Sequence, residues 1–145
     1  MIRTKQLQTL FDIELQFVEG KQRVLTEPGR TGEYLGSGEG AVSGDQINGR
    51  VHWDLFEKVE DTICESNLRG LIETADGATI QFDTLGFFRR PARPDSHIWV
   101  NASAVTFHTE DGRYLWLNEV TGIWQGTFDM ATYRHQYQVY GQGGA

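Results

Sequence analysis

The chain has 145 residues, of which 39% are apolar and 23% charged, and its formal net charge is −7 at pH 7. This length suits one domain with its own core, residues 1–145, and the negative charge argues against a nucleic-acid partner, because phosphate binding relies on Lys and Arg. Cys64 is the single cysteine, which excludes an intrachain disulfide. With no signal-peptide core and no apolar run of membrane-spanning length, the composition favours the cytoplasm and no membrane contact.

Alternation of apolar and polar residues predicts strands in the first part of the chain. Residues 11–17 alternate strictly, and a short strand around 23–26 follows. Seven glycines then lie between Gly29 and Gly49, and we expect them to let strands bend sharply at a barrel corner. Residues 47–57 alternate again, which predicts a further half-buried strand.

The second part of the chain continues the same pattern. The run 98–107 is mostly apolar or small, which is typical of a strand buried on both faces. Residues 129–134 can form one helical turn at most, and no apolar period typical of a helix extends over twelve residues anywhere in the chain. Strands are therefore predicted at 67–74, 78–83, 98–107, 114–120, 123–128 and 135–140.

Two Asp-Gly pairs, Asp76-Gly77 and Asp111-Gly112, lie between alternating apolar residues. Such a pair is a strong hairpin signal, because the tight turn needs a positive φ. About eight or nine strands with short links predict an all-β protein, either a sandwich or a closed barrel. We favour a single antiparallel barrel of about eight strands, because closure removes exposed strand edges.

Two places in the predicted strands carry acid–base candidates. His52 and Asp54 share one strand face, where they could transfer a proton if that face lines a cavity. Glu73 shares a face with Leu71 and Arg69, and burial there would raise the pKa of its carboxyl group. The alternative in both places is a solvent-facing polar surface, with Glu73 paired to Arg69.

A third candidate is the stretch 114–118, where Tyr114, Trp116 and Asn118 would share one face of a strand. Such aromatic stripes are usually core, although an amide beside an aromatic wall can also orient a ligand. The four histidines have no metal-ligand spacing, so no metal site is expected. The glycines Gly36-x-Gly38 do not open a helix, so we expect no dinucleotide and no other cofactor.

Short motifs follow one another in a consistent order along the chain: Pro28-Gly29-Arg30, the glycine-rich stretch to Gly49, His52-Trp53-Asp54, Thr74 to Ile80 with Gly86, Arg113 to Asn118, and Tyr137 to Tyr140. This ordered set resembles the bacterial domain-of-unknown-function 3237 family. The resemblance implies a small antiparallel barrel similar to allene oxide cyclase-like barrels, whose members include cyclases and barrels that guide an apolar ligand. By matching position it draws attention to Arg30, Asp54, Trp116 and Asn118.

The combined hypothesis is a barrel that holds a small apolar or aromatic metabolite, with an isomerisation, cyclisation or lyase step that needs no cofactor. Asp54 or Glu73 would move a proton with help from His52, and Arg30 or Asn118 would stabilise an oxyanion. Trp53, Tyr114 and Trp116 would complete the ligand wall. The alternatives are a carrier barrel without chemistry and a solidly packed module that assembles oligomers; homo-oligomers are expected under each hypothesis.

Overall fold

The computed structural model describes residues 6–17, 23–25, 32–59, 63–89, 93 and 96–142. Its strands form one antiparallel sheet, in the order β1-β9-β8-β7-β6-β5-β4-β3-β2. The elements are β1 (Leu7–Phe17), β2 (Arg23–Leu25), β3 (Gly32–Ser43), β4 (Gly49–Val59), β5 (Ile63–Thr74), β6 (Thr79–Arg89), β7 (Ile98–His108), the 3-10 helix η1 (Leu115–Glu119), β8 (Thr121–Asp129) and β9 (Arg134–Gln142).

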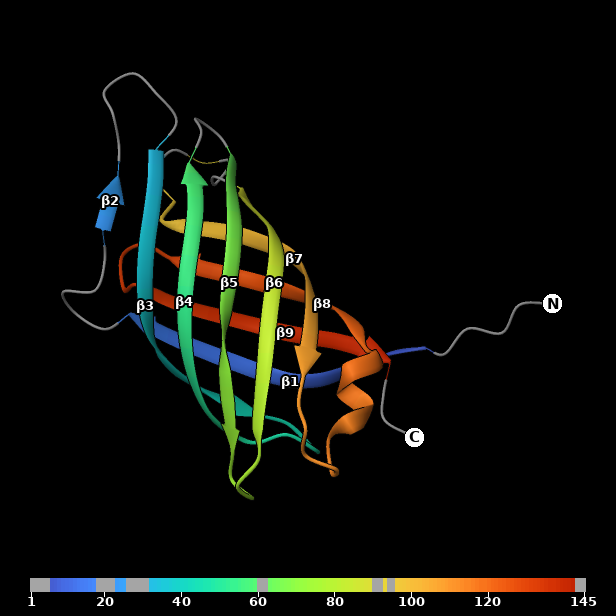
Figure 1. Cartoon of the computed structure of the whole chain (residues 1–145). Coiled ribbons are helices and arrows are strands. Elements are labelled where there is room, and N and C mark those ends of the chain that lie inside the picture. Colours follow the sequence, from blue (N-terminus) through green and yellow to red (C-terminus); the bar gives the residue numbers. More distant parts are fainter. Residues whose placement is uncertain are drawn as a thin grey trace.

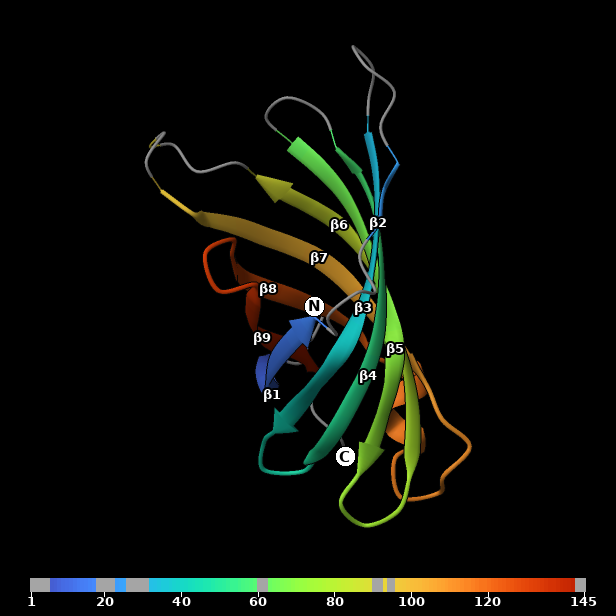
Figure 2. The ribbon, with the colours of Figure 1, turned by 90° about the vertical axis from the view of Figure 1, so that its left-hand side faces the viewer.

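Pairing between β1 and β3 closes this sheet into a barrel of eight strands, while β2 extends the sheet along the other part of β3. The predicted fold class is confirmed. Strands β3 to β6 form one wall, and β7, β8, β9 and β1 cross behind it (Figure 1). The view turned by 90° shows the two walls meeting along the side where η1 lies (Figure 2).

The two ends of the barrel differ, and we call them the capped end and the His135 end. The capped end carries the turn from β5 to β6, the 109–114 loop and η1 (Figure 1). The His135 end is the opposite one, where β1 ends at Phe17, β4 ends at Val59 and β9 begins at Arg134. No helix in the described ranges is both long and apolar enough to cross a membrane.

Strict alternation along the strands decides which side chains fill the barrel. In β6, for example, every second residue from Ile80 to Phe88 is buried, including Phe82 and Thr84, while the alternate residues are exposed. The middle of the barrel is packed with rings: Phe82 stacks on Trp124 with centroids 5.3 Å apart, and Trp124 lies 5.2 Å from Tyr137. The mid-barrel is therefore a hydrophobic core.

Gly38 shows why the glycine-rich segment forms strand β3 beside the closing seam. It pairs with Phe17 of β1 on one side and with Trp53 of β4 on the other. A Cβ at this position would lie 1.8 Å from the carbonyl oxygen of Gln16 and 2.5 Å from the Trp53 ring. Glycine here allows the first and third strands to approach closely enough to pair, and it leaves room for an inward indole.

Three local predictions need correction. Strand β7 alternates between buried and exposed residues and is not buried on both faces, because its outer face meets no second layer. Residues 115–119 form the 3-10 helix η1 instead of a strand. Gly77 has φ +92°, as the hairpin prediction requires, whereas Gly112 is not among the described residues with positive φ. The Asp111 carboxylate accepts a hydrogen bond from the Arg113 amide, so this second turn is built by the Asp side chain.

Candidate functional site

Polar side chains face the barrel interior mainly in its His135 half. They come from β4, β5, β7 and β9, at positions that alternation assigns to the inner face. Polar groups are expensive to bury unless they find partners, so their concentration in one half of the barrel is informative. The group consists of Glu57, Cys64, Ser66, Asn101, Ser103, His135 and Tyr137.

His135 lies at the centre of an aromatic cage. Its imidazole stacks on the ring of Phe128, with centroids 4.3 Å apart and an interplanar angle of 23°. Four further rings surround it at centroid distances of 5.3 to 6.0 Å, and the side chain is only 1% exposed. These rings belong to Phe17 of β1, Trp53 of β4, Phe88 of β6 and Tyr137 of β9.

The environment sets the protonation states of His135 and Tyr137. Burial lowers the pKa of the His135 imidazole to about 3, so the ring is neutral at physiological pH. Burial, with a further contribution from the Glu57 carboxylate, raises the pKa of the Tyr137 phenol well above its ordinary value. The phenol oxygen and the Nδ1 atom of His135 share a short hydrogen bond. A neutral imidazole and a protonated phenol therefore form one fixed pair.

Glu57 is the carboxylic acid of this interior group. Its Oε2 atom accepts a hydrogen bond of 3.0 Å from the Cys64 thiol. Burial raises the pKa of the Glu57 carboxyl group to about 7, against the smaller opposing effect of the Cys64 hydrogen bond. Burial, together with the charge of Glu57, also raises the pKa of the Cys64 thiol, which makes a thiolate nucleophile unfavourable. Glu57 is thus a carboxyl group with a pKa near neutrality, and Cys64 is its hydrogen-bond donor.

Asn101 and Ser103 supply an ordered polar wall on β7. The amide nitrogen of Asn101 donates to the carbonyl oxygen of Phe87 at 3.0 Å, and its Oδ1 atom accepts from the Ser103 hydroxyl at 3.2 Å. Because its partners hold the Asn101 side chain at both ends, this residue contributes shape more than reactivity.

The sequence-predicted acid–base residues lie elsewhere. His52, Asp54 and Glu73 are exposed on the outer face of the barrel, as in the solvent-facing alternative, and not inside the barrel as the catalytic hypothesis requires. His52 lies 3.9 Å from the Glu39 carboxylate and 4.0 Å from the Glu73 carboxylate. Asp54 lines a surface depression of about 500 Å³ together with Arg69 and other outward residues. The physical reason is the period of two: the large apolar side chains of β4 take the inside, so the residues between them point out.

The predicted ligand-wall residues are divided between the two ends. Trp53 faces the interior, is 2% exposed and belongs to the cage, with its Nε1 donating to the Glu39 carbonyl oxygen at 3.1 Å. Tyr114 and Trp116 lie instead at the capped end, packed with the core. The side-chain amide of Asn118 donates to the Thr109 carbonyl oxygen and accepts from its amide, so it anchors the loop. Arg30 lies outside the described residues.

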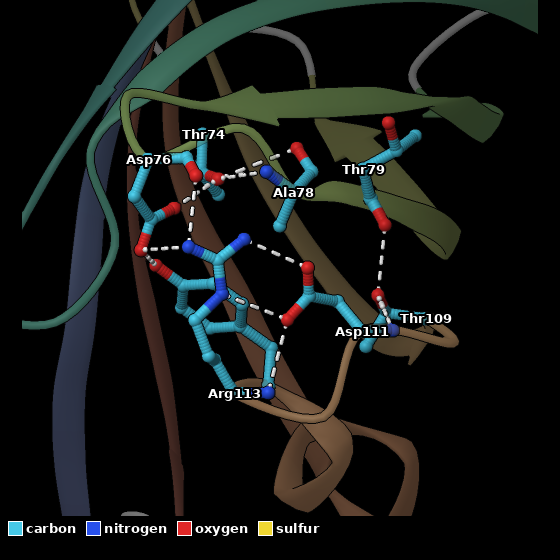
Figure 3. A network of polar contacts seen from close by, with 8 residues as sticks. Thr74, Asp76, Ala78, Thr79, Thr109, Asp111 and Arg113 are labelled. Carbon is cyan, nitrogen blue, oxygen red and sulfur yellow. Dashed lines mark hydrogen bonds and ion pairs between the residues drawn. The ribbon is translucent and has the colours of Figure 1, made fainter.

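The capped end has its own polar network (Figure 3). Arg113 pairs with the Asp111 carboxylate at 2.8 Å and donates to the Asp76 carbonyl oxygen at 2.8 Å. The Tyr114 hydroxyl donates to Asp76 Oδ2 at 2.7 Å, and Thr74 donates to the other carboxylate oxygen. Hydrogen bonds from Arg113 lower the pKa of Asp111 to about 2, and those from Thr74 and Tyr114 lower the pKa of Asp76. The charges of this network are paired, which suits a structural clasp between two loops.

Glu57, His135 and Tyr137 were not singled out from the sequence, although a signal for them exists. Glu57 continues the inward series Val51, Trp53 and Leu55 by two residues, and His135 shares its strand face with Tyr137 and Val139. A polar residue at the inner phase of a strand is the pattern that identifies them. The sequence does not indicate that these side chains lie close together, because the residues of the cage come from strands that are far apart in the chain. No cluster of three or more His, Cys, Asp or Glu side chains suited to a metal ion occurs among the described residues.

Comparison with known proteins gives the same fold with little sequence identity. A barrel-like protein from Acinetobacter baumannii has a TM-score of 0.84 and 19% identity, and the match covers 97% of this chain and 98% of that one. A protein of unknown function from Clostridium acetobutylicum has a TM-score of 0.81 and 20% identity, with 95% and 99% of the two chains covered.

A structure described as an enzyme from Penicillium herquei is a more distant match, with a TM-score of 0.67, 23% identity, and 97% and 98% of the two chains covered. At these identities the likeness shows the fold alone. No curated protein sequence matches the chain. Residues 5–141 match the family described as "Protein of unknown function (DUF3237)", and the chain belongs to that family.

Proposed function

We propose that the barrel binds a small, largely apolar metabolite at its His135 end and moves a proton on it in an isomerisation, cyclisation or lyase step that needs no cofactor. The observation that carries this proposal is Glu57, an inward carboxyl group whose pKa is raised to about 7 and whose charge acts on Tyr137, the hydrogen-bond partner of His135. A carboxyl group poised near neutrality can both accept and return a proton at physiological pH.

The surroundings of Glu57 support this role. The charge of Glu57 contributes to the raised pKa of the Tyr137 phenol, so the carboxyl group acts on the same interior space as the His135–Tyr137 pair. Phe17, Phe88 and Phe128 supply apolar faces around that space. Apolar walls with a few convergent polar groups are the usual composition of a small-molecule site.

A direct test is native mass spectrometry of freshly purified protein, followed by extraction and identification of any co-purifying small molecule. The proposal expects an apolar compound that is recovered altered after incubation with the wild-type protein. The matched variants are Glu57→Gln, which removes the inward carboxyl group, and Glu65→Gln, which removes an exposed one on the neighbouring strand.

Glu57→Gln should retain the compound and lose its conversion by at least about 100-fold, the usual contribution of a positioned acid or base. Glu65→Gln should behave as wild type. Equal conversion by Glu57→Gln and wild type would refute the catalytic role, and recovery of the compound unchanged from wild type would favour the carrier alternative. Failure of any compound to bind in the barrel would refute the proposal as a whole.

A further inference from the structure

A polar atom inside the barrel has no hydrogen-bond partner among the residues that the structure describes. The Nε2 atom of His135 is the buried side-chain nitrogen or oxygen that lacks a hydrogen bond within the described part of the chain, while its ring is 1% exposed. Leaving such an atom unpaired is unfavourable for folding. An unpartnered nitrogen at the centre of an aromatic cage therefore marks the point where a ligand can supply the missing bond.

The hydrogen bond to Tyr137 indicates which kind of partner is missing. A neutral imidazole carries one proton, on either Nδ1 or Nε2. The Tyr137 phenol is protonated, and its hydroxyl lies in hydrogen-bond contact with His135 Nδ1. The arrangement that gives the phenol proton an acceptor leaves Nδ1 bare and places the imidazole proton on Nε2. The unpartnered atom is then a donor, and it requires an acceptor.

The cage restricts the charge of that acceptor. The rings of Phe17, Trp53, Phe88 and Phe128 lie near His135, and apolar side chains cannot replace the hydration of a buried charge. The Glu57 carboxyl group also acts on this space, through its effect on Tyr137. A buried anion would lose its hydration and be repelled by the Glu57 carboxylate, and a cation would lose its hydration and face an N–H donor. A neutral acceptor meets neither obstacle.

We infer that the ligand of this site is a neutral molecule with a flat apolar body and an acceptor oxygen of carbonyl type, which receives a hydrogen bond from Nε2–H of His135. This inference rests on the proposed function and names its ligand class. His135 is the group that touches the ligand, and Tyr137 is a positioning residue, because its phenol holds the imidazole in the tautomer that presents N–H to the ligand.

The first test needs no ligand and no variant. Nitrogen-15 NMR of protein labelled at histidine distinguishes a protonated ring nitrogen from a bare one, and His135→Gln identifies the signals among the four histidines. We expect His135 to carry its proton mainly on Nε2 from pH 5 to 8, because burial keeps the ring neutral and the Tyr137 hydroxyl lies in hydrogen-bond contact with Nδ1. Tyr137→Phe should reduce that preference, an effect that a purely structural role for Tyr137 would not produce. A proton on Nδ1 in the wild-type protein would overturn the inference.

The second test uses acetophenone, its olefin analogue α-methylstyrene, and benzoate as probes, with dissociation constants measured by chemical-shift titration. Acetophenone and α-methylstyrene differ in hydration, so their dissociation constants are not compared with each other directly. For each probe, the dissociation constant of the variant is compared with that of the wild type. His135→Phe should weaken acetophenone about tenfold more than α-methylstyrene, the expected size of one buried hydrogen bond. His135→Gln, which restores an N–H donor, should recover part of that loss, and benzoate should bind more weakly than acetophenone.

The outcomes separate the two proposals. Equal weakening of both neutral probes, with no movement of the Nε2 signal, would overturn the hydrogen-bond inference and leave ligand binding at this end intact. Binding of benzoate in preference to acetophenone would contradict the neutral-ligand class. If none of the probes perturbs signals of the cage, the proposed binding function itself fails at this end. Thermal unfolding of each variant identifies any that does not fold, in which case the tautomer measured in wild type decides.

Discussion

The two ends of this barrel treat their polar groups in opposite ways. At the capped end, Asp76, Asp111 and Arg113 lie partly in solvent and are paired with one another and with Tyr114. At the other end, Glu57 is partly buried and accepts a hydrogen bond from Cys64. His135 is enclosed among rings, and its Nε2 atom has no partner among the described residues. Satisfied, hydrated charges are what a stable closure needs, whereas buried polar groups with spare hydrogen-bonding capacity are typical of sites that bind or react. One small barrel thus keeps paired, hydrated polar groups at one end and buried, incompletely partnered polar groups at the other.

The largest expected effect concerns the packing of Leu117 at the capped end. Leu117 is 0% exposed inside η1, so Leu117→Ala should lower the free energy of unfolding by about 2–5 kcal/mol, through lost burial and a cavity. Urea denaturation measures this. Leu115→Ala is the matched control on the same helix, because Leu115 is 49% exposed and its loss should change stability by no more than about 0.5 kcal/mol. Perturbed His135 NMR signals in folded Leu117→Ala protein would show that the two ends are coupled.

A second prediction concerns the stability of the His135 end against pH. The pKa of Glu57 is about 7 in the folded protein and 4.5 ordinarily, so the folded state holds this proton more tightly than the unfolded state. Stability from this group is complete below pH 4.5 and is lost as the pH rises through 7. The loss by pH 8 is on the order of 3 kcal/mol.

Glu57→Gln should remove this dependence of the free energy of unfolding on pH, and the variant should be more stable than wild type at pH 8. Urea denaturation between pH 5 and 8 measures the difference, with Glu65→Gln as the exposed control. Parallel pH curves for wild type and Glu57→Gln would mean that the carboxyl group is not held in its neutral form.

A third prediction concerns the hydrogen bond between Tyr114 and Asp76 at the capped end. Tyr114→Phe removes the donor to Asp76 and should lower the free energy of unfolding by about 1 kcal/mol. Because its partners lower the pKa of Asp76, their contribution to stability is present above the ordinary pKa of 3.8 and is lost as the pH falls through the lower folded value. The variant should therefore lose less stability than wild type between pH 5 and 2.5 in thermal melts. If the variant loses as much stability as the wild type between pH 5 and 2.5, groups other than the Tyr114–Asp76 pair cause the acid sensitivity.

The smallest effect distinguishes the two Asp-Gly turns. Gly77 has φ +92°, so Gly77→Ala should destabilise the protein by about 1 kcal/mol through backbone strain. At Gly112 an added Cβ would meet no atom within 4 Å, and Gly112→Ala should change stability by about 0.5 kcal/mol or less, in either direction. Thermal unfolding of the pair measures the difference. Equal losses would show that both turns depend on glycine.

The site was less predictable than the scaffold for reasons visible in particular residues. His52 and Asp54 share a strand face, as expected, but that face points outward because Trp53 and Leu55 occupy the core. A pattern of period two indicates which residues lie together on a face, whereas the packing partner decides which face is inside. The cage of His135 joins rings from β1, β4, β6, β8 and β9, and such approaches are set by the closure of the barrel.

What the amino-acid sequence determined by itself is local: alternation predicted the long strands, and Asp76-Gly77 predicted a turn that needs positive φ. These features follow from the geometry of a few neighbouring residues. Tertiary structure decided that residues 115–119 form a 3-10 helix, because the flanking loop is held by hydrogen bonds between Thr109 and Asn118. It also decided that the polar side chain of His135 lies among aromatic rings, with its Nε2 atom unpaired within the described ranges. Burial and partners depend on residues far away in the chain, and only the closed barrel brings them into contact.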